Sequence, residues 1–145
     1  TIVVLYRNEA SYYVYPGHKN DFFVLKGNGS TLTLTSAKQI TGLRWSTTDK
    51  NDTNADAAKA QLANATKGWK VTARLITVAE VQSVGCIEKY NSCPDWLVRG
   101  GASTWFLEAY PGMMDGAYFY ASDKFLGFHY VNASGGIRAA VTVNK

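Results

Sequence analysis

Long hydrophobic runs are missing from the sequence. Its longest apolar stretch covers residues 2–6, whereas a helix that spans a bilayer needs about 20 apolar residues. We therefore expect no membrane insertion. The chain begins with Thr1 rather than Met and shows no targeting segment, so we expect it to be a mature or excised part of a longer protein.

Concentrated charge and clustered metal ligands are also missing. The net charge is +4, but the 15 lysines and arginines are scattered singly and form no basic run, which argues against nucleic acid as a partner. The two histidines, His18 and His129, are isolated, and no loop has the oxygen-rich spacing of a calcium site. We expect neither a metal nor another cofactor.

Cysteine is scarce, and both copies, Cys86 and Cys93, stand close together in GCIEKYNSCP. A metal site would need more ligands nearby. A disulfide that closes this short loop would stabilise the fold by roughly 2.5 kcal/mol, and it would indicate an oxidising, extracytoplasmic location. Two buried free thiols are the alternative.

Aromatic residues are abundant, with nine Tyr, six Phe and four Trp against three Pro, a composition that suits β-sheets and contact surfaces. The length fits a single domain, 1–145. It starts with a β segment, 1–45, in which TLTLT points Leu32 and Leu34 to one buried face after a hairpin turn at 27–29.

A first helix is predicted in ADAAKAQLANATKG, after the polar loop STTDKNDTN. Ala58, Leu62 and Ala65 form one stripe along it, and Gly68 follows its end. Because this stripe is mostly alanine, the helix must lie close against its neighbour.

A second helix is predicted in GWKVTARLITVAEVQ. Thr77 and Glu80 have the spacing of a capping box, in which each side chain bonds the other residue's backbone amide. Ile76 and Val81 are spaced as a hydrophobic staple, and the helix should stop near Gly85.

Beyond Cys86 the helical period ends, and glycines divide the chain into short β segments. GAYFYAS and FLGFHYVN alternate like the arms of a hairpin, and GIRAAVTV is expected to form a closing strand. The predicted fold class is α+β, with mixed, mainly antiparallel sheets and two short helices.

GWKVTARLITVAEV, STWFLEAY and GIRAAVTV follow one another in this order. The first resembles the Gly-Trp-Arg-Leu-Pro-Thr-x-x-Glu signature of the formylglycine-generating-enzyme-like branch of the C-type lectin fold. The second stands where relatives in bacterial surface proteins carry Tyr-Trp-Thr-Ser-Ser, and the third is similar to the closing strand of the group. The resemblance covers roughly residues 55–145, although Ile76 replaces the signature proline.

The resemblance implies a C-type-lectin-like domain in which the N- and C-terminal strands are adjacent, with residues 2–6 paired to residues 139–143. It also implies that Arg138 ties the last strand to the second helix or to the loop before it, with Glu80 as the candidate partner. An exposed arginine on an edge strand is the alternative.

The enzymes of this group use two reactive thiols in the C-terminal core, and this sequence has no cysteines at matching positions. A cysteine-based oxidase is therefore only our third hypothesis. The Glu-Pro-Asn or Gln-Pro-Asp triplet and the Trp-Asn-Asp strand of calcium-dependent sugar-binding relatives are missing as well. The chain is therefore similar to a non-catalytic member of the group.

The candidate binding surface is the aromatic-rich segment 105–130. Alternation along strands allows only about half of these residues to enter the core, although burial of most of them is the alternative. We place Phe119 in the core, because a buried tyrosine must find a partner for its hydroxyl group. The predicted ligand-binding residues are Trp105, Tyr110, Tyr118, Tyr120, His129 and Tyr130.

These features predict an extracellular ligand-binding module at a cell or virion surface, as in the bacterial and phage surface proteins it resembles. Its partner would be a protein or a glycan on another surface. The alternative is a structural subunit of an extracellular filament or tail fibre, in which the same aromatic face self-associates.

The natively purified chain is expected to contain a disulfide between Cys86 and Cys93. Its intact mass should rise by two hydrogens on reduction, which mass spectrometry under denaturing conditions measures. Two free thiols before reduction would contradict both the disulfide and the oxidising location.

Overall fold

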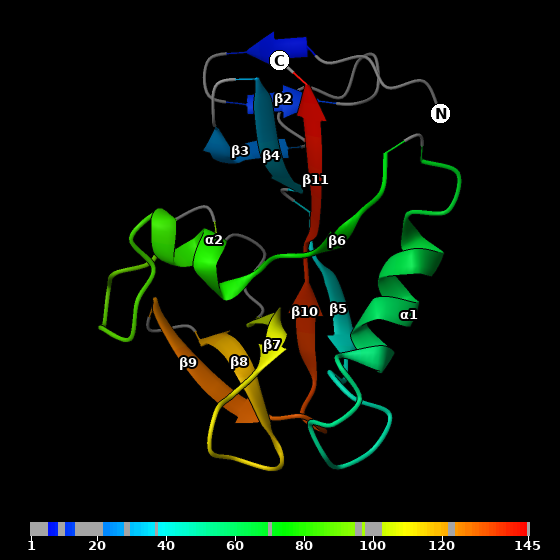
Figure 1. The fold of residues 1–145 in the computed structure, drawn as a ribbon, viewed down its shortest axis with the longest axis vertical. Helices are drawn as coiled ribbons and strands as arrows, with labels where there is room; N and C mark the ends of the chain where they lie inside the picture. The colour runs from blue at the N-terminus through cyan, green and yellow to red at the C-terminus, as the bar shows by residue number, and fades with distance from the viewer. Residues whose placement is uncertain are drawn as a thin grey trace.

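Two β-sheets occupy opposite ends of the long axis in the computed structural model, which describes residues 6–8, 11–13, 22–27, 30–36, 38–69, 71–94, 97, 103–121 and 124–144 (Figure 1). The six-stranded sheet has the order β1 (Tyr6–Asn8), β2 (Ser11–Tyr13), β3 (Phe22–Gly27), β4 (Thr31–Ser36), β11 (Ala139–Asn144) and β6 (Arg74–Leu75). The five-stranded sheet has the order β5 (Ile40–Leu43), β10 (Gly135–Ile137), β7 (Thr104–Ala109), β8 (Gly116–Ala121) and β9 (Phe125–Tyr130).

Helices α1 (Asp56–Ala65) and α2 (Val78–Ser83) flank the junction of the sheets on opposite sides (Figure 1). All strand pairs of the described residues are antiparallel except β10 with β7. The predicted α+β class, with mixed, mainly antiparallel sheets and two short helices, is therefore confirmed.

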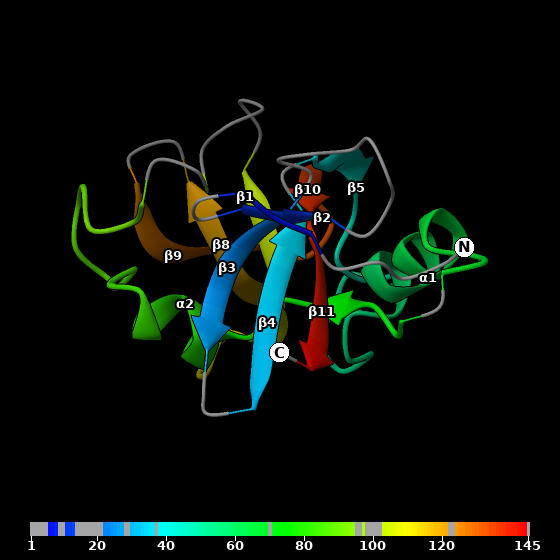
Figure 2. The same cartoon turned by 90° about the horizontal axis from the view of Figure 1, so that it is seen from above.

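The β3–β4 hairpin forms where the sequence predicts it, and in Figure 2 the strands β3, β4 and β11 lie side by side in that order. Leu32 and Leu34 are buried on one face, opposite Val143 and Val141 of β11. Such aliphatic pairs across an antiparallel ladder stabilise the register. Together with Phe22 they form the core of this sheet.

The predicted pairing of residues 2–6 with residues 139–143 is wrong where the structure describes it. Tyr6 belongs to β1 and pairs with Tyr13 of β2, and three strands separate β1 from β11. The neighbours of β11 are β4 and β6, because β4 offers the matching buried leucines. Residues 2–5 lie outside the described residues.

The predicted closing strand is divided in two. β10 pairs in the five-stranded sheet and β11 in the six-stranded sheet, so the chain changes sheets at Arg138. Arg138 is 1% exposed and donates through Nη1 to the carbonyl of Ser36 at 3.2 Å and through Nη2 to the carbonyl of Leu97 at 3.2 Å. The alternative of an exposed arginine is therefore wrong.

Helix α1 packs through Ala58 and Leu62, which are buried beside Trp45 and Trp105. The predicted third member of the stripe, Ala65, is exposed because the helix ends there. The small side chain of Ala58 lets the helix approach closely, and its amide donates to the carbonyl of Trp45 at 3.4 Å.

Helix α2 begins with the predicted capping box. The Glu80 amide donates to the Thr77 hydroxyl at 3.2 Å, and the Thr77 amide donates to Glu80 Oε1 at 2.9 Å. Glu80 also binds Arg74 of β6 in a bidentate ion pair, with both N–O distances 2.7 Å. Glu80, which was the expected partner of Arg138, thus ties α2 to β6.

The predicted disulfide between Cys86 and Cys93 is present, and both residues are buried. They share one hydrophobic cluster with Ile76, Val81, Leu97, Phe106 and Leu126. Trp105, which precedes Phe106 in β7, belongs to a second hydrophobic cluster. Because successive residues of a strand point to opposite faces, β7 is buried on both of its faces.

The capping box and the ion pair should contribute separately to stability. Thr77→Ala is expected to lower the free energy of unfolding by about 1 kcal/mol, and Glu80→Gln by roughly 1–3 kcal/mol because it also leaves Arg74 without its carboxylate. Gln82→Ala, an exposed substitution in the same helix, is the control. Urea denaturation of the three variants measures the differences, and an equal loss in all three would contradict this assignment.

The Glu80 ion pair should also make stability depend on pH. Burial by itself raises the pKa of Glu80, but hydrogen bonds from Arg74 and from the Thr77 backbone outweigh it and hold that pKa below its ordinary value. The stability that comes from a lowered carboxyl pKa is present above the pKa of the unfolded chain and is lost as the pH falls through the folded value. Below about pH 4, wild type should therefore lose stability more steeply than Glu80→Gln.

Candidate binding surface

Three aromatic rings form a continuous group on the five-stranded sheet, and we call Tyr110, Tyr118 and Phe128 the aromatic cluster. The ring centroid of Tyr110 lies 5.0 Å from that of Tyr118 and 4.5 Å from that of Phe128. Tyr118 and Phe128 are direct partners in the β8–β9 register, so they share one face of the sheet. Phe128 is 45% exposed, whereas the two tyrosines are half-buried.

Hydrogen bonds hold the turn between β7 and β8, which carries Tyr110 of the aromatic cluster. The Tyr110 amide donates to the carbonyl of Gly116 at 3.0 Å, which closes the turn between β7 and β8. The Asn51 side chain donates to the carbonyls of Met113 and Gly116. The polar loop before α1 therefore fixes the turn that carries Tyr110.

One side of the aromatic cluster, formed by Tyr118, packs on the core. Tyr118 packs against the cluster that contains the disulfide, and Leu126, on the same face of β9, is fully buried there. The opposite face of β8 carries Ala117, which is buried beside Trp105. Each face of this hairpin is partly covered by a hydrophobic cluster. The aromatic cluster lies at the boundary between these buried residues and solvent.

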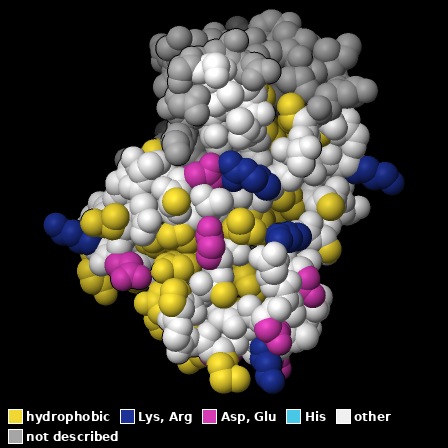
Figure 3. All heavy atoms as spheres, in the orientation of Figure 1, with side chains coloured by type: hydrophobic (Ala, Val, Ile, Leu, Met, Phe, Trp, Pro, Cys, Tyr) yellow, Lys and Arg dark blue, Asp and Glu magenta, His cyan; other side chains and the backbone are white. Residues whose placement is uncertain are grey.

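Two carboxylates lie beside the aromatic cluster. Glu108 Oε2 accepts a hydrogen bond of 2.9 Å from the Val78 amide at the start of α2, and Glu88 is exposed in the disulfide loop. Burial raises the pKa of the Tyr118 hydroxyl above its ordinary value, and Glu88, Tyr110 and Glu108 add to the shift. On this side of the molecule hydrophobic side chains gather next to acidic ones (Figure 3).

The disulfide loop continues this surface along β9. The Leu126 amide donates to the carbonyl of Ile87 at 2.9 Å, and the Cys93 amide donates to the carbonyl of Lys124 at 3.0 Å. Tyr90 is 68% exposed and its ring lies 4.9 Å from that of Phe125. The loop is thus bound to the edge of the sheet and presents a separate exposed aromatic ring.

The predicted ligand-binding residues are brought together only in part. Tyr110 and Tyr118 meet in the aromatic cluster, and His129 and Tyr130 are exposed on β9, with their rings 5.8 Å apart. The side chains of Tyr120 and Phe119 lie outside the described residues, so their assignment to opposite faces stays a prediction.

The prediction that Trp105 lies on the ligand-binding surface is wrong. It is completely buried, and its indole Nε1 donates to the carbonyl of Leu43 at 3.0 Å. Phe128 is not among the predicted ligand-binding residues. Its position in the hairpin could have indicated it, because pairing of GAYFYAS with FLGFHYVN puts a phenylalanine opposite Tyr118.

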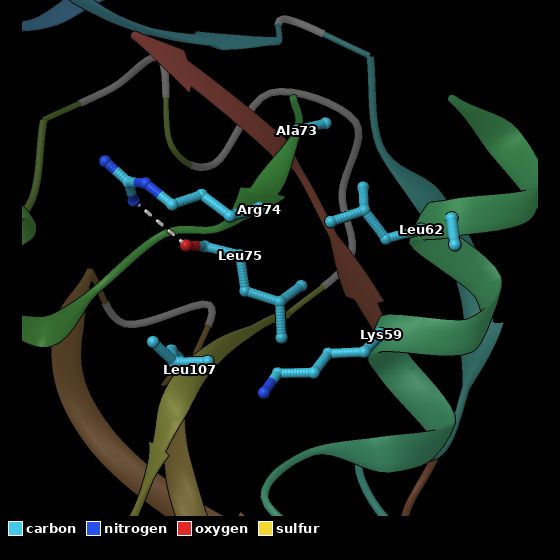
Figure 4. A pocket seen from close by; sticks show the side chains of 7 residues that line it. Lys59, Leu62, Ala73, Arg74, Leu75 and Leu107 are labelled. Atoms are coloured by element: carbon cyan, nitrogen blue, oxygen red, sulfur yellow. Dashed lines mark hydrogen bonds between the residues drawn. The ribbon is translucent and has the colours of Figure 1, made fainter. Parts of the chain in front are cut away.

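A hollow between α1 and β6 is another candidate site (Figure 4). Its volume is about 240 Å³, and its apolar lining includes Leu62, Leu75 and Leu107. Lys59 lies at its edge, while the head of Arg74 points away from it (Figure 4). Because Leu62 and Leu75 are 3% and 1% exposed, the hollow offers little apolar surface to a ligand.

Among the described residues, no group of three or more His, Cys, Asp or Glu side chains could hold a metal ion. No described helix has the length and apolar character that crossing a membrane requires.

No family model, curated protein or solved structure matches the chain. The function is therefore inferred from the geometry of the aromatic cluster and its surroundings.

Burial of Trp105 predicts a structural role for this residue. Trp105→Ala is expected to lower the free energy of unfolding by roughly 3–5 kcal/mol, because it leaves a large cavity. Tyr130→Ala, which removes an exposed ring, should change it by less than about 0.5 kcal/mol. Urea denaturation followed by circular dichroism measures both values. A Trp105→Ala variant as stable as wild type would restore Trp105 to the binding surface.

Proposed function

We propose that the protein is an extracellular ligand-binding module that makes contact through the aromatic cluster. One observation carries this proposal: the exposed ring of Phe128 lies 4.5 Å from that of Tyr110, which in turn contacts the half-buried Tyr118. Aromatic residues of this kind contribute much of the energy of protein contacts. Because the rings already pack on one another and Tyr118 packs on the core, this surface would lose little conformational entropy on binding a partner.

The partner that we propose is a protein or a glycan on another surface. Aromatic rings bind both classes, by packing against side chains or against the apolar faces of sugars. The disulfide supports an extracellular setting, because such bonds persist in oxidising compartments. A place on a cell or virion surface agrees with both features.

We also propose that residues 55–144 follow the C-type-lectin-like arrangement. The order of α1, the capped helix α2, the β7–β9 meander and the last strand supports it. The position of β11 between β4 and β6 is a departure from that pattern. A binding role without catalysis agrees with the disulfide, because the two cysteines are bonded to each other.

A filament or tail-fibre subunit is the second candidate. It is favoured by exposed apolar side chains outside the aromatic cluster, namely Ile87, Tyr90, Met114 and Tyr130. In a subunit, these side chains would pack against copies of the same chain. Sedimentation velocity over a range of concentrations separates the candidates, since a subunit assembles and a binding module stays small.

Removal of rings from the aromatic cluster should weaken ligand binding. On glycan and protein arrays probed with and without a chelator, Phe128→Ala and Tyr110→Ala are each expected to lose roughly 1–3 kcal/mol of binding energy relative to wild type. Tyr90→Ala, which removes an exposed ring of the disulfide loop, is the matched control. If both cluster variants bind every array ligand as wild type does, the proposal fails.

A further inference from the structure

The charge beside the aromatic cluster differs in sign from that of the whole protein. The chain carries a net charge of +4, yet two carboxylates lie around the aromatic cluster. Glu108 stands two residues before Tyr110 and bonds the Val78 amide, and Glu88 follows Ile87, whose carbonyl accepts from the Leu126 amide of β9. A local negative potential on a basic protein repels anions and attracts cations, most strongly at low ionic strength. Carboxylates at this surface would therefore favour a cationic ligand.

Neither carboxylate forms an ion pair with a described side chain. Arg74 is close enough to Glu108 for an electrostatic effect, but both of its terminal nitrogens bind Glu80 at 2.7 Å. Lys89 lies next to Glu88 in the chain, and among the described side chains neither of the two forms an ion pair. The acidic groups thus remain open to a cation from outside.

The position of Glu108 is fixed before any ligand arrives. Its Oε2 atom accepts the hydrogen bond from the Val78 amide, and no hydrogen bond from a described residue occupies Oε1. The ring of Tyr118 lies on the covered side of the aromatic cluster, and that of Phe128 on the open side. The ring of Phe128 and the side chain of Glu108 are both at least partly exposed.

This combination is the chemistry that recognises a guanidinium group. The negative face of an aromatic ring attracts a cation, and the planar guanidinium of arginine both stacks on rings and donates to carboxylates. A lysine ammonium has the charge but cannot stack. A neutral sugar would gain from the rings but not from the charge of Glu88.

We propose that the aromatic cluster binds an arginine side chain of a protein partner, with the guanidinium stacked on Phe128 and Tyr110 and directed toward Glu88 and Glu108. This proposal rests on the proposed function of the aromatic cluster as the contact surface. The ligand class is accordingly a basic, arginine-containing segment of a protein.

The probe for this proposal is a short fluorescent peptide with two arginines among glycine and serine residues. The same peptide with citrulline, which keeps the shape and removes the charge, is the matched control ligand. A neutral oligosaccharide tests the glycan alternative. Binding to the whole chain is measured by fluorescence anisotropy and, with isotope-labelled protein, by amide chemical shifts.

The arginine peptide should bind more tightly than the citrulline peptide, and added salt should weaken it. Glu88→Gln is expected to lower its affinity about two- to fivefold, and Phe128→Ala by a similar factor or more. Asp52→Asn removes an exposed carboxylate of the polar loop and should leave the affinity unchanged. Amide shifts should concentrate on β8, β9 and residues 87–89.

Equal binding of the arginine and citrulline peptides, or no effect of Glu88→Gln, overturns the arginine inference. Failure of the arginine peptide to bind overturns it as well. If the oligosaccharide binds and is lost in Phe128→Ala, the aromatic cluster is still a binding surface and only its ligand class is wrong. If array ligands bind equally to wild type and to the cluster variants, the proposed function itself fails.

Discussion

A buried arginine holds the point where the chain passes from one sheet to the other. Arg138 donates to the carbonyl at the end of β4 and to the carbonyl of Leu97, and the Ala139 amide beside it donates to the Ser36 hydroxyl. A strand that leaves one sheet and enters another must find partners for its backbone groups at the crossing. Loss of the guanidinium would leave buried carbonyls unpaired, at a cost of about 1–3 kcal/mol each.

The crossing determines how the rest of the molecule is supported. The buried cluster that contains Trp45 and Trp105 is called the tryptophan cluster. Because β10 and β11 belong to different sheets, one short segment of chain joins the core of the six-stranded sheet, around Leu32 and Leu34, to the tryptophan cluster of the five-stranded sheet. The ion pair between Arg74 and Glu80 adds a second link, from β6 of the six-stranded sheet to α2. Helix α2 belongs to the hydrophobic cluster around the disulfide, which is called the disulfide cluster. Each link is made by a charged group that donates or accepts several hydrogen bonds.

The aromatic cluster depends on this support. The β7–β8 hairpin is covered on one face by the disulfide cluster and on the other by the tryptophan cluster. The rings of the aromatic cluster lie at its exposed end, where Tyr118 packs on the cluster that contains the disulfide. A surface whose rings are ordered in advance loses less conformational entropy on binding than a flexible loop does. The charge beside the rings then selects the ligand.

The sequence alone determined the local features, and the tertiary structure decided which side chains reach solvent. The capping box at Thr77, the β3–β4 hairpin and the disulfide could be predicted because each depends on residues only a few positions apart. The burial of Trp105, the change of sheet at Arg138 and the exposure of Phe128 could not. The period of two assigns side chains to two faces of a strand, but it does not say what packs on either face. That depends on segments far away in the chain, and only their packing leaves the rings of the aromatic cluster at the surface.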